Sequence, residues 1–174
     1  MRFGAPAVAL SLVLAVTASV GMGKRPADDQ INPRSQALVA EGVAFAGAQK
    51  FDDAISAFET ALAVDPRNRS AFIHLAHVAQ KQGLPGKAIR LYREALLLDP
   101  NDLSALSGQG AAMVQKGALT KAKENLARIT RLCVSSCAEQ LSLSAAIEKG
   151  EKTPTVITAE AIKPKPVVTG TTTP

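Results

Sequence analysis

The chain is poor in the residues that several kinds of functional site require. Its 174 residues include no tryptophan, two histidines and two cysteines, and only 3% of them are aromatic. So few rings leave few platforms on which bases could stack, and the formal net charge of +5 is spread without a continuous basic stripe. We therefore expect no nucleic-acid partner.

Sequence patterns that carry catalysis are also missing. The chain has no Gly-rich phosphate loop, no pair of carboxylates in a plausible cleft and no Ser-His-Asp order above chance. The adjacent acids Asp52 and Asp53 fit the first turn of a helix, where negative charge faces the helix dipole favourably. We predict that the protein is not an enzyme and has no catalytic residues, no cofactor and no small-molecule substrate.

One long apolar run stands near the start of the chain. It extends from Ala5 through Val20, follows Arg2 and is separated from Lys24 by Gly21-Met22-Gly23, which is the layout of a secretory signal peptide. We predict this signal over residues 1–23 and a periplasmic location for the rest. The run is short for a membrane span, which needs about 20 apolar residues. An uncleaved anchor is the alternative, and only then is membrane contact expected.

The central part of the chain repeats at a step of 34 residues. The segment ALAVDPRNRSAF, which starts at Ala61, matches ALLLDPNDLSAL, which starts at Ala95. Seven columns align at this step: Leu38/Phe72/Leu106, Gly42/Ala76/Gly110, Phe45/Ala79/Met113, Ala54/Ala88/Ala122, Phe58/Tyr92/Leu126, Ala61/Ala95/Ile129 and Pro66/Pro100/Val134. Small residues let helices approach closely and the large ones fill the space between neighbours. A period of this length indicates stacked helical hairpins.

Stop and start signals recur with the same period. Pro66 and Pro100 each follow an apolar run, and proline cannot continue a helix, so the helix should end before them. Asn68 and Asp102 come two residues later and are good N-caps for the next helix. These signals predict helices over residues 35–48, 52–64, 69–82, 86–98, 103–116 and 120–132.

These residues resemble the tetratricopeptide repeat, which has two antiparallel helices in each unit of 34 residues. The resemblance implies an all-α fold, a right-handed superhelical stack of three helical hairpins over 35–134 (35–68, 69–102 and 103–134). A capping helix is expected over 135–149, a polar linker over 24–34 and a disordered or extended Pro/Thr/Lys tail over 150–174. The third unit departs from the pattern at Ile129 and Val134, which suits a terminal unit.

In that family the first helix of each unit usually lines an inner groove. The resemblance implies a partner-binding stripe of Val39, Val43, Ala46, Ile73, His77, Gln80, Ser107, Ala111 and Val114. Many relatives clamp a terminal carboxylate with lysine and asparagine on this stripe, whereas Val39 and Val43 stand at the first clamp positions here. We expect a small, mildly apolar groove that suits a helix or extended segment better than an acidic tail.

The two cysteines, Cys133 and Cys137, lie four residues apart at the end of the third unit. In an oxidising compartment such a lone pair most simply forms a disulfide, which would pin the final helix against the third unit. A redox-active pair, or half of a metal or haem site, is the alternative. His74 and His77 are three apart on one predicted helix, as metal ligands can be, but have no acidic or cysteine partner nearby in sequence. We predict no metal site.

These expectations combine into one function and two alternatives. The first is a periplasmic protein–protein interaction scaffold whose concave groove binds a peptide or helix of a partner envelope protein. The second is a redox or metal-handling protein that uses Cys133, Cys137 and His77. The third is a stable subunit of an envelope assembly machine.

Overall fold

The structure is a computed structural model that describes residues 31–135 and 137–152, and these residues form seven α-helices. The helices are α1 (Pro33–Gly47), α2 (Phe51–Val64), α3 (Arg69–Lys81), α4 (Pro85–Leu98), α5 (Leu103–Gln115), α6 (Leu119–Leu132) and α7 (Ala138–Lys152). The first six begin and end within two residues of the predicted bounds. The predicted signal, most of the linker and residues 153–174 of the tail lie outside the described residues.

The two Asp-Pro turns end one hairpin and begin the next. Asp65 and Asp99 adopt extended backbone at the C-termini of α2 and α4, as expected for residues that precede proline. The side chains of Asn68 and Asp102 then accept hydrogen bonds, of 3.3 and 2.7 Å, from the backbone amide three residues on. These caps start α3 and α5, so the repeated sequence signals fix where the hairpins turn.

The N-terminal boundary differs from the predicted one. Helix α1 begins at Pro33 rather than residue 35, because Asn32 caps it by accepting a hydrogen bond from the amide of Arg34. The amide of Asn32 donates to the carboxylate of Asp65 at 3.0 Å, and the Ile31 side chain is buried. Residues 31–34 of the predicted linker 24–34 therefore belong to the packed first hairpin.

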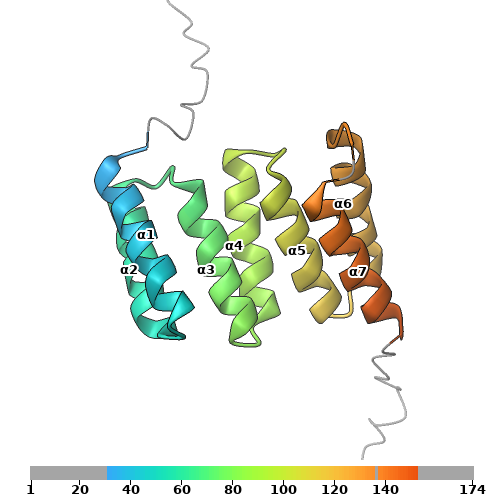
Figure 1. The fold of residues 1–174 in the computed structure, drawn as a ribbon, viewed down its shortest axis with the longest axis horizontal. Coiled ribbons are helices and arrows are strands. Elements are labelled where there is room, and N and C mark those ends of the chain that lie inside the picture. The colour runs from blue at the N-terminus through green and yellow to red at the C-terminus, as the bar shows by residue number, and fades with distance from the viewer. Residues whose placement is uncertain (1–30, 136, 153–174) are drawn as a thin grey trace, which may run out of the picture.

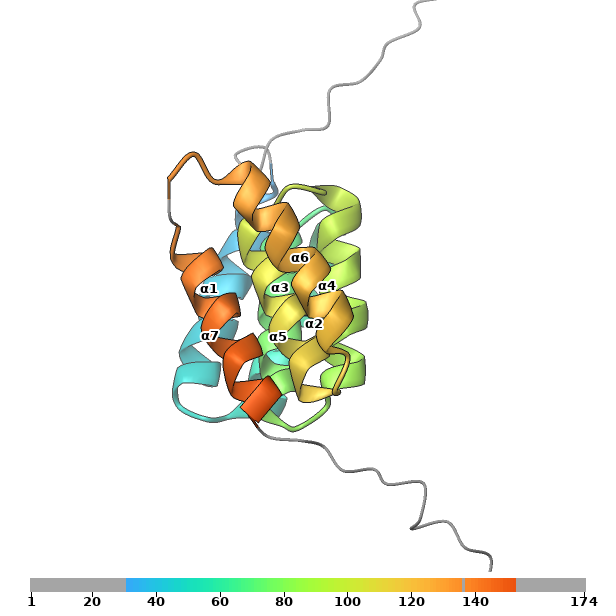
Figure 2. The same cartoon turned by 90° about the vertical axis from the view of Figure 1, so that its right-hand side faces the viewer.

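The helices form two layers along the stack. Successive first helices, α1, α3 and α5, contact one another and α7 continues this row, while α2, α4 and α6 form the second layer (Figure 1). Helix α7 lies against both α5 and α6 (Figure 2). Among the described residues no helix is long and apolar enough to cross a membrane.

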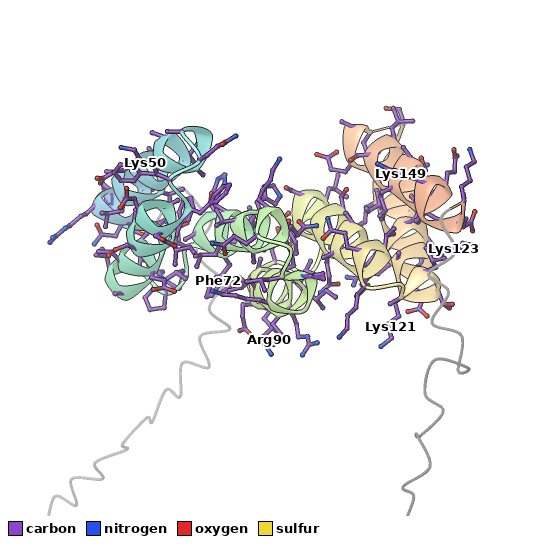
Figure 3. The ribbon with its side chains drawn as sticks, turned by 90° about the horizontal axis from the view of Figure 1, so that it is seen from below. Lys50, Phe72, Arg90, Lys121, Lys123 and Lys149 are labelled. Atoms are coloured by element: carbon purple, nitrogen blue, oxygen red, sulfur yellow. A yellow bond between two sulfur atoms is a disulfide. The ribbon has the colours of Figure 1, made fainter. Side chains whose placement is uncertain are left out.

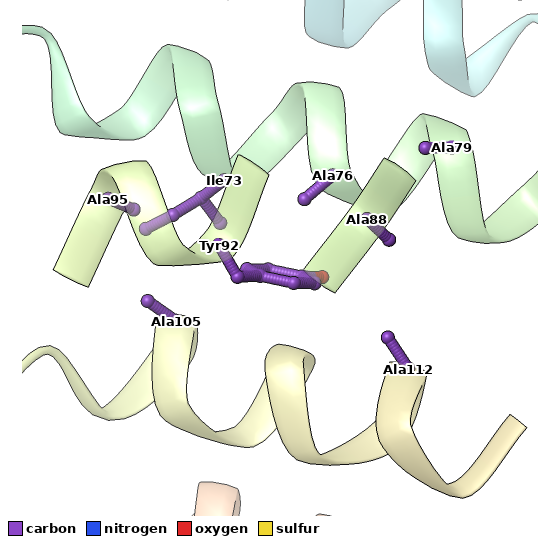
Figure 4. Close-up of a cluster of buried hydrophobic side chains, with 8 residues drawn as sticks. All are labelled: Ile73, Ala76, Ala79, Ala88, Tyr92, Ala95, Ala105 and Ala112. Atoms are coloured by element: carbon purple, nitrogen blue, oxygen red, sulfur yellow. The ribbon is translucent and has the colours of Figure 1, made fainter. Parts of the chain in front are cut away.

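Small residues give the stack its close packing. The Tyr92 ring is fully buried between α3 and α5, where alanines leave room for it (Figure 4). A Cβ added to Gly42 of α1 would lie 2.5 Å from the Phe58 ring of α2. The columns of small and large residues in the sequence are thus opposing surfaces in the fold.

Helix α7 closes the apolar end of the third hairpin. Leu143 is fully buried, and a Cβ added to Gly110 of α5 would lie 2.7 Å from its side chain. The helix runs to Lys152, three residues beyond the predicted end. Gly150 does not stop it, because that residue packs against Val114, which a Cβ there would approach to 2.6 Å.

Candidate functional site

A hollow opens between the first two hairpins on the side of the first helices. Its volume is about 460 Å³, and we call it the inner hollow. The residues that line it come from the end of α1, the α1–α2 turn, α2 and α3: Val43, Ala46, Gly47, Gln49, Phe51, Phe58, His74, His77, Val78 and Lys81. A cavity of this size and apolar character is typical of a binding site.

Four rings form a row in which the two histidines lie between the buried rings of Phe58 and Tyr92. His74 stacks on Phe58 with the ring centroids 5.4 Å apart and the planes 12° apart. The His77 ring lies edge-on to His74 at 6.1 Å and to Tyr92 at 5.7 Å. The Tyr92 hydroxyl donates a 2.7 Å hydrogen bond to Oε1 of Gln80. The two imidazoles therefore belong to an aromatic wall, which is held in place by buried neighbours.

The environment favours the neutral form of both imidazoles. Burial, reinforced by the charge that His77 can carry, lowers the pKa of His74. His77 keeps an exposed edge, but the protein around its ring desolvates it in part and so lowers its pKa, reinforced by the positive charge of Lys81. At neutral pH both rings are uncharged, which leaves Lys81 as the charged side chain of this lining.

The structure divides the predicted stripe rather than presenting it as one open surface. Val43, Ala46 and His77 line the inner hollow, and Gln80 supports it through Tyr92. Val39 and Ile73 are buried in the packing between helices, with less than a tenth of their surface exposed. Val39 and Ile73 lie one helical turn before Val43 and His77, and at that level the stripe faces the core.

Helix α7 covers part of the stripe on the third unit. The Ser107 hydroxyl donates a 3.1 Å hydrogen bond to the Glu139 backbone carbonyl of α7, and Ser107 is buried. Val114 packs against Gly150, while Ala111 is half-buried. The capping helix thus occupies space that the sequence interpretation left to a partner.

Several residues of the inner hollow were not predicted as site residues. From the sequence, Phe58 is predicted only as a residue that fills the space between hairpins, and His74 is considered only as a possible metal ligand. No sequence pattern indicated a binding role for Gln49, Phe51, Val78 or Lys81, because these residues line the hollow from a turn and from helix positions outside the stripe. The stacking of His74 on Phe58 could have been sought from the aromatic pair alone, since these residues occupy facing helices of adjacent repeats.

The cysteine pair lies at the α6–α7 corner, away from the inner hollow. Cys133 caps the end of α6 and is joined to Cys137 by a disulfide, as predicted, with the Cα atoms 6.1 Å apart. The Cys137 carbonyl accepts hydrogen bonds from the amides of Gln140 and Leu141 at the start of α7. Within the described part of the chain, no group of three or more His, Cys, Asp or Glu residues is placed to hold a metal ion.

Comparison with known proteins connects this geometry to a family. Residues 45–108 match the family model described as tetratricopeptide repeat. A stretch of 57 residues is 44% identical to cellulose synthase 2 operon protein C of Komagataeibacter xylinus; it covers 33% of this chain but only 4% of that protein's length.

Solved structures extend the likeness to most of the described helices. The tetratricopeptide-repeat domain of Sgt2 from Aspergillus fumigatus is similar with a TM-score of 0.62 and 25% identity, covering 70% of this chain and 82% of that one. The second such domain of human RPAP3, in complex with the HSP70 peptide SGPTIEEVD, has a TM-score of 0.61 and 21% identity, covering 69% and 97%. The type III secretion translocator chaperone SycD of Yersinia enterocolitica has a TM-score of 0.62 and 21% identity, covering 70% and 94%. Residues 45–108 therefore resemble tetratricopeptide repeats in sequence, and the seven described helices have the fold of tetratricopeptide-repeat domains.

Proposed function

We propose that this protein is a periplasmic interaction scaffold that binds a peptide or helix from another envelope protein on the row of first helices. The observation that carries the proposal is the inner hollow, an apolar and aromatic recess in a repeat fold. The similar human RPAP3 domain is in complex with a peptide, which supports the same kind of use here. We propose no reaction and no cofactor for it.

The character of the inner hollow suits a protein segment. Val43 at its rim is 43% exposed although it is a large apolar residue, so a partner side chain that covers it would remove apolar surface from water. The aromatic wall is fixed by packing on Phe58 and Tyr92, which lowers the entropy lost when a ligand is bound.

The test of binding is photocrosslinking in cells. A photoreactive residue at Ile73 would be unsuitable, because that side chain is buried in the core. Val43 is the better position, and Arg90 of α4, on the outer layer, serves as the control (Figure 3). A discrete adduct from Val43 alone would support the proposal and would identify the partner by mass spectrometry. Adducts from Arg90 alone would instead assign binding to the outer layer.

The periplasmic location is proposed from the N-terminal sequence and needs its own test. The apolar run between Arg2 and Lys24 supports export. The mass of the protein recovered from the periplasmic fraction should correspond to cleavage near residue 23. Recovery of the uncleaved chain with the membrane fraction would support an anchored form, and recovery from the cytoplasm would overturn the proposed location.

A further inference from the structure

We propose that the inner hollow takes one apolar side chain of a partner segment, and that Lys81 pairs with the side-chain carboxylate of an Asp or Glu beside that residue. This inference rests on the proposed function and specifies the chemistry of the partner. It predicts a short internal motif of an apolar residue next to an acidic one.

The apolar half of the motif follows from the lining of the inner hollow. Its accessible apolar lining comes from Val43, Ala46 and Phe51, and the buried side chains of Phe58 and Val78 lie behind it. The volume of about 460 Å³ is within the range of roughly 300–1,000 Å³ that is common for ligand pockets. A branched or aromatic side chain would cover more of this apolar lining than an alanine would.

The two imidazoles can orient the backbone of the bound segment. Neither His74 nor His77 has a hydrogen-bond partner among the described residues, and both have ring contacts instead. A neutral imidazole offers one N–H donor and one nitrogen acceptor. His77 is exposed, so its ring can exchange such bonds with a peptide group at the mouth of the hollow.

The acidic half of the motif follows from the charges around the inner hollow. Lys81 is exposed and forms no ion pair with a described residue. A second hollow of about 430 Å³ adjoins the first through Gln49 and Phe51, and it is lined by Lys50, Asp52, Asp53 and Gln82 as well. Its two aspartates would repel a carboxylate. The acidic residue of the partner should therefore point toward the end of α3 and away from the start of α2.

A side-chain carboxylate fits this arrangement better than a chain terminus. Lys81 is one point charge on a flexible stem, and no second cationic side chain lines the inner hollow. Val39 and Val43 supply no polar group on α1. An internal Asp or Glu needs one charged partner, and the apolar side chain beside it supplies the remaining affinity.

The test is selection from a random-peptide display library in which each peptide is fused through its C-terminus, so that no peptide has a free terminal carboxylate. The bait is the full chain, with Lys81→Gln as the variant and Lys50→Gln, in the second hollow, as the matched control. Wild type and K50Q should enrich peptides with a large apolar residue next to Asp or Glu. On K81Q the selected peptides should lose up to about fivefold in affinity, the size of an exposed ion pair. Replacing the acidic residue of a selected peptide by its amide should reduce the affinity for wild type by the same factor. The same replacement should not reduce the affinity for K81Q any further.

Three results would overturn the inference: enriched peptides without an acidic residue, equal binding to K81Q, or no enriched peptide at all. The proposed function is judged separately, by the crosslink from Val43. Acid-free peptides that lose binding on Val43→Asp would leave that function standing while rejecting the role of Lys81. Circular dichroism of each variant checks that the fold is retained.

Discussion

The side-chain amide of Asn68 donates a 2.8 Å hydrogen bond to the hydroxyl of Ser35, which lies 33 residues earlier in the chain. That hydroxyl donates in turn to the carbonyl of Ala61 at 2.7 Å, and both side chains are buried. Asn68 also caps α3. One side chain therefore starts the second hairpin and joins it to the first.

We expect Asn68→Ala to destabilise the protein by about 1–3 kcal/mol, because it removes a helix cap and leaves the buried Ser35 hydroxyl without one partner. Urea unfolding measures the loss. Asn101→Ala, at an exposed position of the next turn, is the control and should stay within about 0.5 kcal/mol of wild type. A similar loss in both variants would contradict the role of the buried bond.

The close contact between α1 and α2 predicts a second effect. Gly42→Ala would place a Cβ 2.5 Å from the Phe58 ring, so we expect overpacking to cost about 1–3 kcal/mol. Because Phe58 lines the inner hollow, the variant should also weaken binding of selected peptides. Gly86→Ala in α4 is the control, since a Cβ there meets nothing within 4 Å and Gly86 does not line the inner hollow. Unchanged stability of G42A would show that α1 and α2 can separate at little cost.

The packing of the capping helix leads us to expect different losses of stability at two leucines that lie two positions apart. Leu143 is fully buried against α5, and its change to alanine should cost about 2–5 kcal/mol. Leu141 is 61% exposed, so the same change there should stay within about 0.5 kcal/mol. Denaturant unfolding of both variants, with the disulfide intact, makes the comparison. Equal effects would argue that α7 is held mainly by the Cys133–Cys137 bridge.

The histidine pair predicts how stability depends on pH. The folded structure lowers the pKa of His74 and His77 below the ordinary value of 6.5, so the unfolded chain binds more protons between the folded pKa values and 6.5. The contribution of the two histidines to the free energy of unfolding should be complete above about pH 6.5. It should decrease as the pH falls through that window. Urea titrations between pH 7.5 and 5 measure this slope.

A single variant separates the histidines from other titrating groups. His74→Phe keeps a ring stacked on Phe58 and removes one proton-binding group, so it should flatten the slope. Asp65 does not interfere, because its hydrogen bonds from the Arg67 side chain and the Asn32 amide lower its pKa to about 2. An unchanged slope in H74F would assign the pH dependence to other groups.

The helices could be predicted closely from the sequence because their signals are local. Proline, N-cap side chains and the 34-residue period all act within a few residues of a helix end, as at Pro66 and Asn68. The missed boundary at Ile31 and Asn32 depends on a contact with Asp65, more than 30 residues away. No local sequence pattern indicates such a distant partner.

The site was less predictable for a geometric reason. Helical spacing shows which residues share a face, but it does not show how much of that face the neighbouring helices cover. Ile73 and His77 share one predicted stripe, yet Ile73 is buried and His77 is exposed. Ser107 is covered because α7 packs there, and the docking of α7 depends on Leu143 fitting against Gly110.

Several polar bonds join helix ends at one edge of the stack, some within a hairpin and some between hairpins. The bonds from Asn32 to Asp65, from Arg69 to Asp99 and Asp102, and from Arg128 to the Pro100 carbonyl all lie at the edge with the Asp-Pro turns. The inner hollow is lined in part by the α1–α2 turn and the end of α3. These segments lie at the opposite edge of the stack (Figure 1). Bending of the superhelix should therefore pivot on the tied edge and widen or narrow the hollow, so that the curvature of the stack and the occupancy of the site are mechanically linked.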